Sequence, residues 1–172
     1  MKGLVILFSS LLCYAFVQVH ASCISQKMKF RIDDPAFFPN EMDIWTTEGR
    51  NSDLSQTAVV TFYPVYFVQG KSYLTNYTKN RLANLLDLLL KNPEYRIRIY
   101  GHTDNLLGDD ESMELSEQRA EAVVQFLTGM GLSRSRIAIA AGLGKTCPAF
   151  PNTSEENRKL NRRVEFELFV DE

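Results

Sequence analysis

Alternating apolar and polar residues in the second half of the chain predict several β-strands. The clearest stretches are 96–100 and 163–169, where apolar side chains take every second position. A period of two is typical of a strand with one buried face. Residues 136–141 form a third apolar stretch of strand length, and 65–68 form a fourth. Pro64, just before that stretch, has no N–H and therefore marks an edge or a bulge.

Apolar residues between these strands recur every three or four positions, the spacing of an amphipathic helix. The first helix is expected over 75–91, with Thr75 as its cap, and it ends before an Asn-Pro pair. A second helix is expected over 112–130, after a polar loop, with Ser112 as its cap. A short third helix is expected over 154–159.

The predicted order of elements is β-α-β-α-β-(α)-β. This order favours an α/β (α+β) sandwich in which the helices cover one face of a mixed sheet. Charged residues alternate with the apolar ones on two of the strands, which predicts that the other face is at least partly wet. These residues are Arg96, Arg98, Glu165 and Glu167.

The first third of the chain is organised differently. Residues 28–32 alternate like a strand, and 41–48, which includes Trp45, is a second short strand candidate. We interpret 22–57 as an N-terminal extension with short β-structure, followed by the main domain at 58–172.

The first 21 residues have the features of a secretory signal peptide. Lys2 precedes an apolar run, and Val19 and Ala21 supply the small or aliphatic residues that a signal peptidase requires. Cleavage would leave Ser22 as the first residue. The alternative is an uncleaved membrane anchor, which the shortness of the run disfavours. These features thus predict an exported protein.

The cysteines leave three alternatives open. Ala21 and Ser22 fit the residues that precede a lipidated cysteine in bacterial lipoproteins, so Cys23 could carry a lipid, but His20 does not fit that pattern. Without a lipid, Cys23 and Cys147 are an even pair in an exported chain, which favours a disulfide. The third alternative is two buried free thiols.

Composition and charge narrow the class of protein. The chain has 172 residues, 45% hydrophobic and 23% charged, which is ordinary for a globular domain. Its net charge is -2, whereas a protein that neutralises nucleic-acid phosphates is normally basic, so no nucleic-acid partner is expected. Two histidines leave little material for a catalytic metal site. No cofactor and no metal are expected.

Three short motifs carry the functional hypothesis. They are G-H-T-D at 101–104, L-S-x-x-R-A at 115–120 and N-R-R-V-E at 161–165. In this order and at this spacing they resemble the OmpA-like peptidoglycan-binding domain family of Gram-negative envelopes, over about residues 65 to 170. Asp104 and Arg119 lie fifteen positions apart, as in that family.

The resemblance implies a protein of the periplasm or outer membrane that faces the periplasm. It also implies non-covalent binding of peptidoglycan through the diaminopimelate residue of its stem peptide. One end of diaminopimelate carries an ammonium and a carboxylate on one carbon. Asp104 can accept the ammonium, and the planar fork of Arg119 can hold the carboxylate with two parallel bonds. The implied ligand-binding residues are Asp104, Arg119, Thr103, Leu115, Arg163 and Asn161, where Thr103 and Leu115 flank the pocket and the last two support it.

Plainer interpretations compete with these roles. An aspartate after a strand is most often a turn residue, and an arginine within a helix is most often solvated. Arg163 fits a structural or rim position better than a primary ligand, and Leu115 fits the core better than a contact. The chain also departs from the family, because the stretch around Gln69 supplies no carboxylate and Ser112 stands where the family tends to have asparagine.

Two other functions remain as alternatives. His102 and Asp104 could ligate zinc in a wall hydrolase, but His102 is the only histidine left after cleavage, so the sequence favours a binding protein that is not an enzyme. The extension could instead dock an outer-membrane or envelope protein, with weak or lost wall binding. Alanine at Asp104 or Arg119 is expected to weaken wall binding without unfolding the domain, since neither residue is expected in the core.

Overall fold

The computed structural model describes residues 45–46 and 60–170. The strand expected at 28–32, the signal peptide and Cys23 lie outside these residues. The strands are β1 (Trp45–Thr46), β2 (Val60–Tyr66), β3 (Tyr95–Gly101), β4 (Ile137–Gly142) and β5 (Arg163–Val170). The helices are α2 (Asn76–Lys91), α3 (Asp109–Gly129), the 3-10 turn η2 (Arg134–Arg136) and α4 (Glu155–Asn161).

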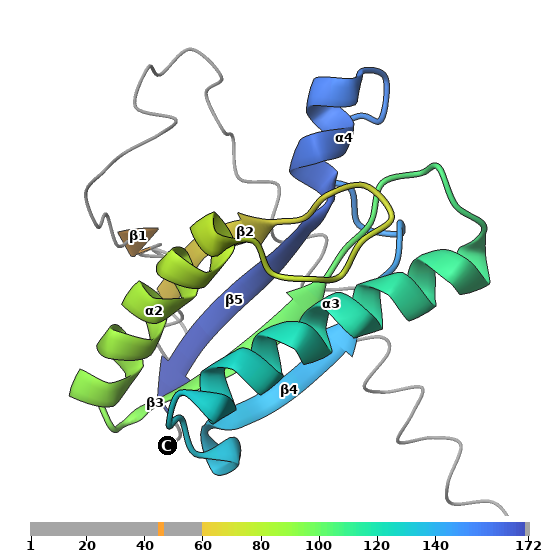
Figure 1. Cartoon of the computed structure of the whole chain (residues 1–172). Coiled ribbons are helices and arrows are strands. Elements are labelled where there is room, and N and C mark those ends of the chain that lie inside the picture. Colours follow the sequence, from red (N-terminus) through yellow and green to blue (C-terminus); the bar gives the residue numbers. More distant parts are fainter. Residues whose placement is uncertain (1–44, 47–59, 171–172) are drawn as a thin grey trace, which may run out of the picture. The chain divides into compact units, whose positions relative to one another are not determined.

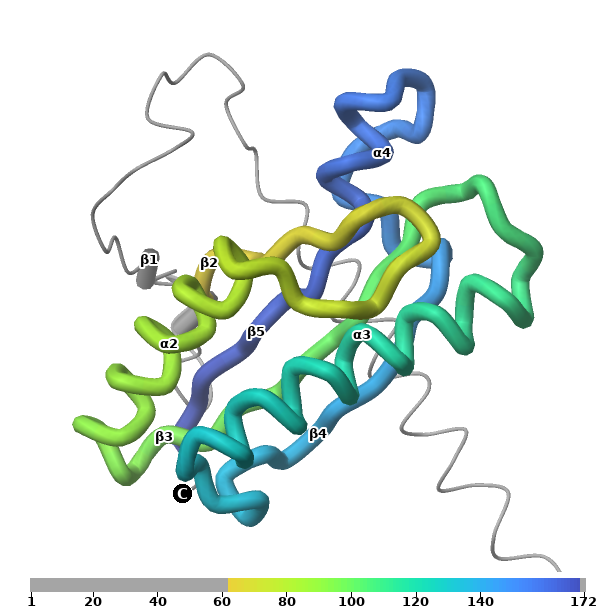
Figure 2. Tube along the Cα trace, in the orientation of Figure 1, coloured from red at the N-terminus to blue at the C-terminus, as the bar shows by residue number. Residues whose placement is uncertain are grey.

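The strands form one mixed sheet in the order β1-β2-β5-β3-β4. Only β3 and β4 are parallel, while the other neighbours are antiparallel. Helices α2 and α3 lie on the same face of the sheet, and α4 lies beyond the end at which β5 begins (Figure 1). The tube in Figure 2 shows that the chain between β2 and α2 passes close to α3. The predicted order of elements and the one-sided helical layer are confirmed.

The hydrophobic core lies between the two long helices and the sheet. Leu82, Leu85 and Leu89 of α2 are fully buried, as are Val123 and Leu127 of α3. They pack against apolar side chains that point from the strands toward the helices, such as those at 97, 99, 164, 166 and 168. The period-two and helical patterns therefore identified the core faces of these elements.

Helix α3 begins three residues earlier than predicted. Gly108 is its N-cap, and the Glu111 side chain accepts a hydrogen bond from the Gly108 backbone N–H at 3.0 Å. Three acidic residues in the first turn stabilise the helix, because their negative charges interact favourably with the positive end of its dipole. Ser112, the expected cap, is instead fully buried inside the helix. The expected strand at 65–68 is also displaced, because β2 ends at Tyr66.

The bulge expected at Pro64 is present. The pairing of β2 with β5 shifts register between Phe62 and Val65, which places the proline where no ladder hydrogen bond is needed.

The face of the sheet without helices is only partly wet. Arg98 keeps a third of its side chain exposed, lies 4.1 Å from the centre of the Phe169 ring and contacts Glu167 at 3.4 Å. Glu167 and Phe169 are both buried. The charges on this face are therefore paired and stacked more than the alternation alone indicated.

Cys147 is buried and disulfide-bonded in the structure. The cysteine at the other end of that bond lies outside the described residues. A pairing with Cys23 remains a prediction.

Candidate functional site

The three sequence motifs meet at one end of the sheet. Because β3 and β5 are antiparallel, the end of β3 lies beside the start of β5, and Gly101 pairs with Val164. The His102 N–H donates to the Arg163 carbonyl at 2.9 Å, which extends this pairing by one residue. Residues 102–104 and 161–163 are therefore neighbours in space, and α3 brings Arg119 to the same place.

Asp104 is buried, with 4% of its surface exposed. Its Oδ2 accepts a hydrogen bond from Arg162 Nη1 at 2.7 Å. Its Oδ1 accepts from the Leu106 N–H at 3.3 Å, as in an Asx turn. The turn-residue interpretation therefore holds for Oδ1, whereas Oδ2 is already paired with Arg162, so an ammonium would have to share one of these oxygens.

Arg119 is completely buried, which corrects the expectation that it lies outside the core. Its guanidinium donates to three backbone carbonyls: Lys71 at 2.9 Å, His102 at 2.7 Å and Val68 at 3.2 Å. It also lies 5.2 Å from the centre of the Phe67 ring. These bonds connect the segment after β2 to the end of β3, so Arg119 has a structural role whatever it binds.

Burial lowers the pKa of Arg119 to about 10, and the negative charge of Asp104 opposes that fall. Arg119 therefore remains a cation at neutral pH. No direct bond joins Asp104 and Arg119, but the two charges are close enough to influence each other.

Arg162 is the site residue that sequence reasoning missed. Its side chain is buried and lies between two carboxylates, Asp104 Oδ2 and Glu155 Oε1, each at 2.7 Å. Burial alone would lower the pKa of Arg162, but its hydrogen bonds to these two carboxylates raise it. The N-R-R-V-E motif contains both arginines. The resemblance implies Arg163, the second, whereas Arg162, the first, contacts Asp104.

Thr103 and Leu115 take different positions near this cluster. Thr103 is buried, its N–H donates to the Gly144 carbonyl at 2.9 Å, and its hydroxyl has no hydrogen-bond partner among the described residues. Leu115 is half-buried, one helical turn before Arg119 on α3, and is not part of the core.

Asn161 and Arg163 hold a loop in place. Asn161 is fully buried and exchanges two hydrogen bonds with the Phe150 backbone, at 2.8 and 3.0 Å. Arg163 donates to the Cys147 carbonyl at 3.1 Å and to Glu165 at 2.7 Å. These contacts support the interpretation that both residues are structural.

His102 is enclosed beneath the site. Its Nε2 lies 3.6 Å from Glu165 Oε2. Burial and the charge of Arg163 lower the pKa of His102, so its imidazole is neutral at pH 7. Among residues 45–46 and 60–170, no group of three or more His, Cys, Asp or Glu side chains could hold a metal ion. In this part of the chain the geometry thus gives the zinc hydrolase alternative no support.

Glu165→Gln is expected to remove much of the acid sensitivity of folding. Burial would raise the pKa of Glu165, but His102 and Arg163 outweigh it and lower the pKa to about 2. Because this value is below the ordinary 4.5, the carboxylate stabilises the fold above about pH 4.5 and loses that effect as the pH falls toward 2. We expect the variant to lose about 2 kcal/mol at pH 7 and progressively less in acid.

Urea unfolding from pH 7 to 2 measures this difference, with the exposed Glu121→Gln as the control. A gap between wild type and Glu165→Gln that stays constant with pH would contradict the assignment.

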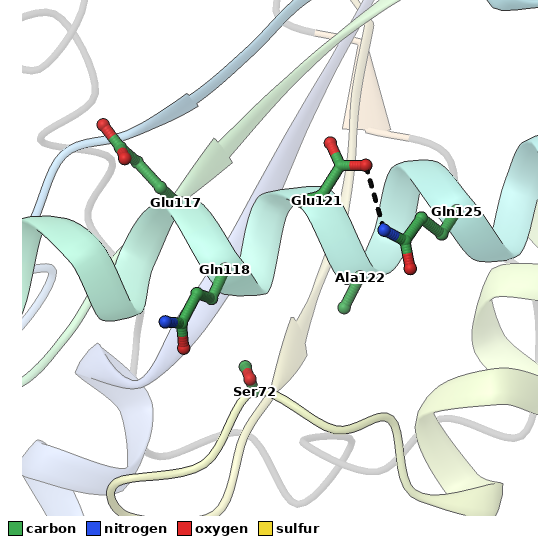
Figure 3. Close-up of a pocket in the computed structure, with 6 residues that line it drawn as sticks. All are labelled: Ser72, Glu117, Gln118, Glu121, Ala122 and Gln125. Carbon is green, nitrogen blue, oxygen red and sulfur yellow. Dashed lines mark hydrogen bonds between the residues drawn. The ribbon is translucent and has the colours of Figure 1, made fainter.

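A shallow hollow of about 430 Å³ lies between Ser72 and helix α3. Its lining residues are Ser72, Glu117, Gln118, Glu121, Ala122 and Gln125 (Figure 3). Ser72 faces α3 across the hollow. It directly follows Lys71, whose carbonyl accepts a hydrogen bond from Arg119. Asp104 and Arg119 do not line the hollow, and both side chains are buried in this structure.

Comparisons with known proteins agree with the motifs. The model of the OmpA family matches residues 66–162. The chain is 36% identical over 101 residues to outer membrane porin F of Pseudomonas fluorescens, covering 59% of this chain and 31% of the porin. It is 35% identical over 119 residues to the peptidoglycan-binding protein ArfA of Mycobacterium tuberculosis (strain ATCC 25618 / H37Rv), covering 68% of this chain and 36% of ArfA. The match thus spans about a third of the length of these curated relatives.

A solved structure shares the fold. The peptidoglycan-associated lipoprotein from Burkholderia pseudomallei superposes with a TM-score of 0.58 at 27% sequence identity, covering 61% of this chain and 88% of that one. The expected fold and its architectural class are therefore confirmed by a solved relative as well as by the structure itself.

Proposed function

Because the chain belongs to the OmpA family, we propose that it binds peptidoglycan non-covalently and anchors an envelope protein to the cell wall. The observation that carries this proposal is the convergence of all three motifs on one buried cluster of Asp104, Arg119 and Arg162. The names of ArfA and of the Burkholderia lipoprotein, one peptidoglycan-binding and one peptidoglycan-associated, support it. The family relation makes the chain a binding protein and not an enzyme.

We propose the diaminopimelate residue of the stem peptide as the group that is recognised. Asp104 takes its ammonium, and Arg119 takes its carboxylate. A guanidinium has five N–H groups, and the three hydrogen bonds of Arg119 leave donors for a ligand. Since Arg119 is fully buried, the carboxylate reaches it only when the segment at 68–71 moves aside. Thr103 and Leu115 would then border the ligand, while Asn161 and Arg163 act from behind through the loop they hold.

Asp104→Asn is the variant that tests the site. The amide keeps the shape of the side chain but removes the charge that an ammonium needs, so binding to purified sacculi should weaken at least about tenfold. Co-sedimentation with sacculi, with free diaminopimelate as the competitor, measures the effect. Asp110→Asn, on an exposed residue of the same region, is the matched control.

If Asp104→Asn is folded and sediments like wild type, the proposed site is wrong. If free diaminopimelate does not release the wild-type chain from sacculi, the recognised group is a different part of the wall.

The proposal also includes the location of the protein in the cell. We propose that the chain is exported to the periplasm or the periplasmic face of the outer membrane, with 58–172 as the wall-binding domain and 22–57 as the segment that contacts an envelope partner. No helix in the part of the chain that the structure describes is long and apolar enough to cross a bilayer. Mass spectrometry of the exported chain tests the start at Ser22 and shows whether Cys23 carries a lipid.

A further inference from the structure

We propose that Glu155 determines the specificity of this site, by keeping Asp104 available to an ammonium. Glu155 is the first residue of α4, on a segment that the expected ligand set did not include. The inference rests on the proposed function, since it assigns Glu155 a role in selecting the zwitterionic end of diaminopimelate over a ligand with a carboxylate alone.

Arg162 divides its hydrogen bonds between two carboxylates. Its Nη1 donates to Asp104 and its Nη2 donates to Glu155, both at 2.7 Å. One guanidinium thus serves two carboxylates with one nitrogen each. As a result Asp104 has a single bond to this cation, through Oδ2 only.

The other oxygen of Asp104 is weakly engaged. Among the described residues, Oδ1 accepts only the Leu106 N–H, at 3.3 Å, and a carboxylate oxygen has room for a further donor. An incoming ammonium can use that capacity. Without Glu155, both terminal nitrogens of Arg162 are free to pair with Asp104 in the bidentate arrangement that carboxylates and guanidinium groups favour. That arrangement would occupy Oδ1 and compete with the ligand.

The charges lead to the same conclusion. Asp104 and Glu155 balance the charges of Arg119 and Arg162, which suits a ligand end that is itself a zwitterion. Arg158 adds one cation at the rim, 2.9 Å from Glu155. Removing the charge of Glu155 would raise the excess of positive charge from one to two. Such a site attracts a carboxylate more and an ammonium less.

The test compares two competitors for sacculus binding by the full chain, diaminopimelate and pimelate, which has the same carbon chain without amino groups. For wild type we expect diaminopimelate to compete far better. For Glu155→Gln we expect the preference for diaminopimelate over pimelate to fall by roughly fivefold, the order produced by one missing charge near the site. Glu155→Asp keeps the charge and should retain most of the preference.

Glu156→Gln is the matched control, because Glu156 is the next residue and its surroundings include Ser154 and Lys159 but not Arg162. A preference in Glu155→Gln equal to that in Glu156→Gln would overturn the inference. Equal loss of both competitors would also overturn it, since that is what a purely structural role predicts. If the wild-type chain binds no sacculi, the proposed function fails first and this inference fails with it.

Discussion

Replacing Gly101 by alanine is expected to destabilise the domain by about 3 kcal/mol. Gly101 is the last residue of β3, where α3 crosses most closely. A Cβ atom there would overlap the Ser116 carbonyl oxygen and lie 2.9 Å from the carbonyl carbon. These are backbone atoms of a helix, so the clash cannot be relieved by turning a side chain. The helix would have to move away from the sheet, which would open the core.

Urea unfolding measures this effect, and Gly129→Ala is its control. Gly129 is the last residue of α3, and an added Cβ there meets nothing within 4 Å. Alanine is the better helix former, so this variant should be neutral or more stable by up to about 1 kcal/mol. Similar stability of the two variants would mean that α3 does not approach β3 as closely as described.

Replacing Arg119 by alanine is expected to destabilise the domain by about 3 kcal/mol, before any effect on binding. The change leaves three carbonyls, those of Val68, Lys71 and His102, without their donor and opens a void in a fully buried position. Thermal and urea unfolding measure the loss. Arg134→Ala is the control, because Arg134 is exposed and donates one bond, to the Ile137 carbonyl at 3.2 Å.

An unchanged stability in Arg119→Ala would show that the guanidinium is not held as described. The expected loss also means that weak wall binding by this variant would not identify a ligand contact. For this reason Asp104→Asn, which removes the charge but keeps the side-chain volume, is the better test of the site.

The fold was readable from the sequence where a local rule decides the structure. Helix α2 begins after Thr75 as expected, because the Thr75 hydroxyl accepts the Thr78 N–H, and α4 has Ser154 as its cap for the same reason. The start of α3 could not be predicted, because Gly108 has no side chain to act as a cap. The capping hydrogen bond instead joins the Gly108 N–H to the Glu111 side chain. Ser112, four residues after Gly108, was the stronger but misleading signal.

The motifs predicted some residues of the site but not the contacts between them. Asp104, in the loop that follows β3, and Arg119, on α3, lie in one region, where the charge of Asp104 acts on Arg119. The partner of Asp104 was not readable, since Arg162 lies 58 positions away and reaches it only because β5 begins beside the end of β3. The burial of Arg119 could not be predicted either, because it depends on the carbonyls of Val68 and Lys71, which lie in a segment without regular structure.

The position of β5 in the sheet also determines when the domain can fold. Strand β5 lies between β2 and β3, which pair with it and not with each other. Until Arg163–Val170 has been synthesised, the β1–β2 pair and the β3–β4 pair have nothing to join them, and the core between the sheet and helices α2 and α3 cannot close. A chain that lacks β5 would therefore have no closed core, so folding of the domain waits for the synthesis of this strand.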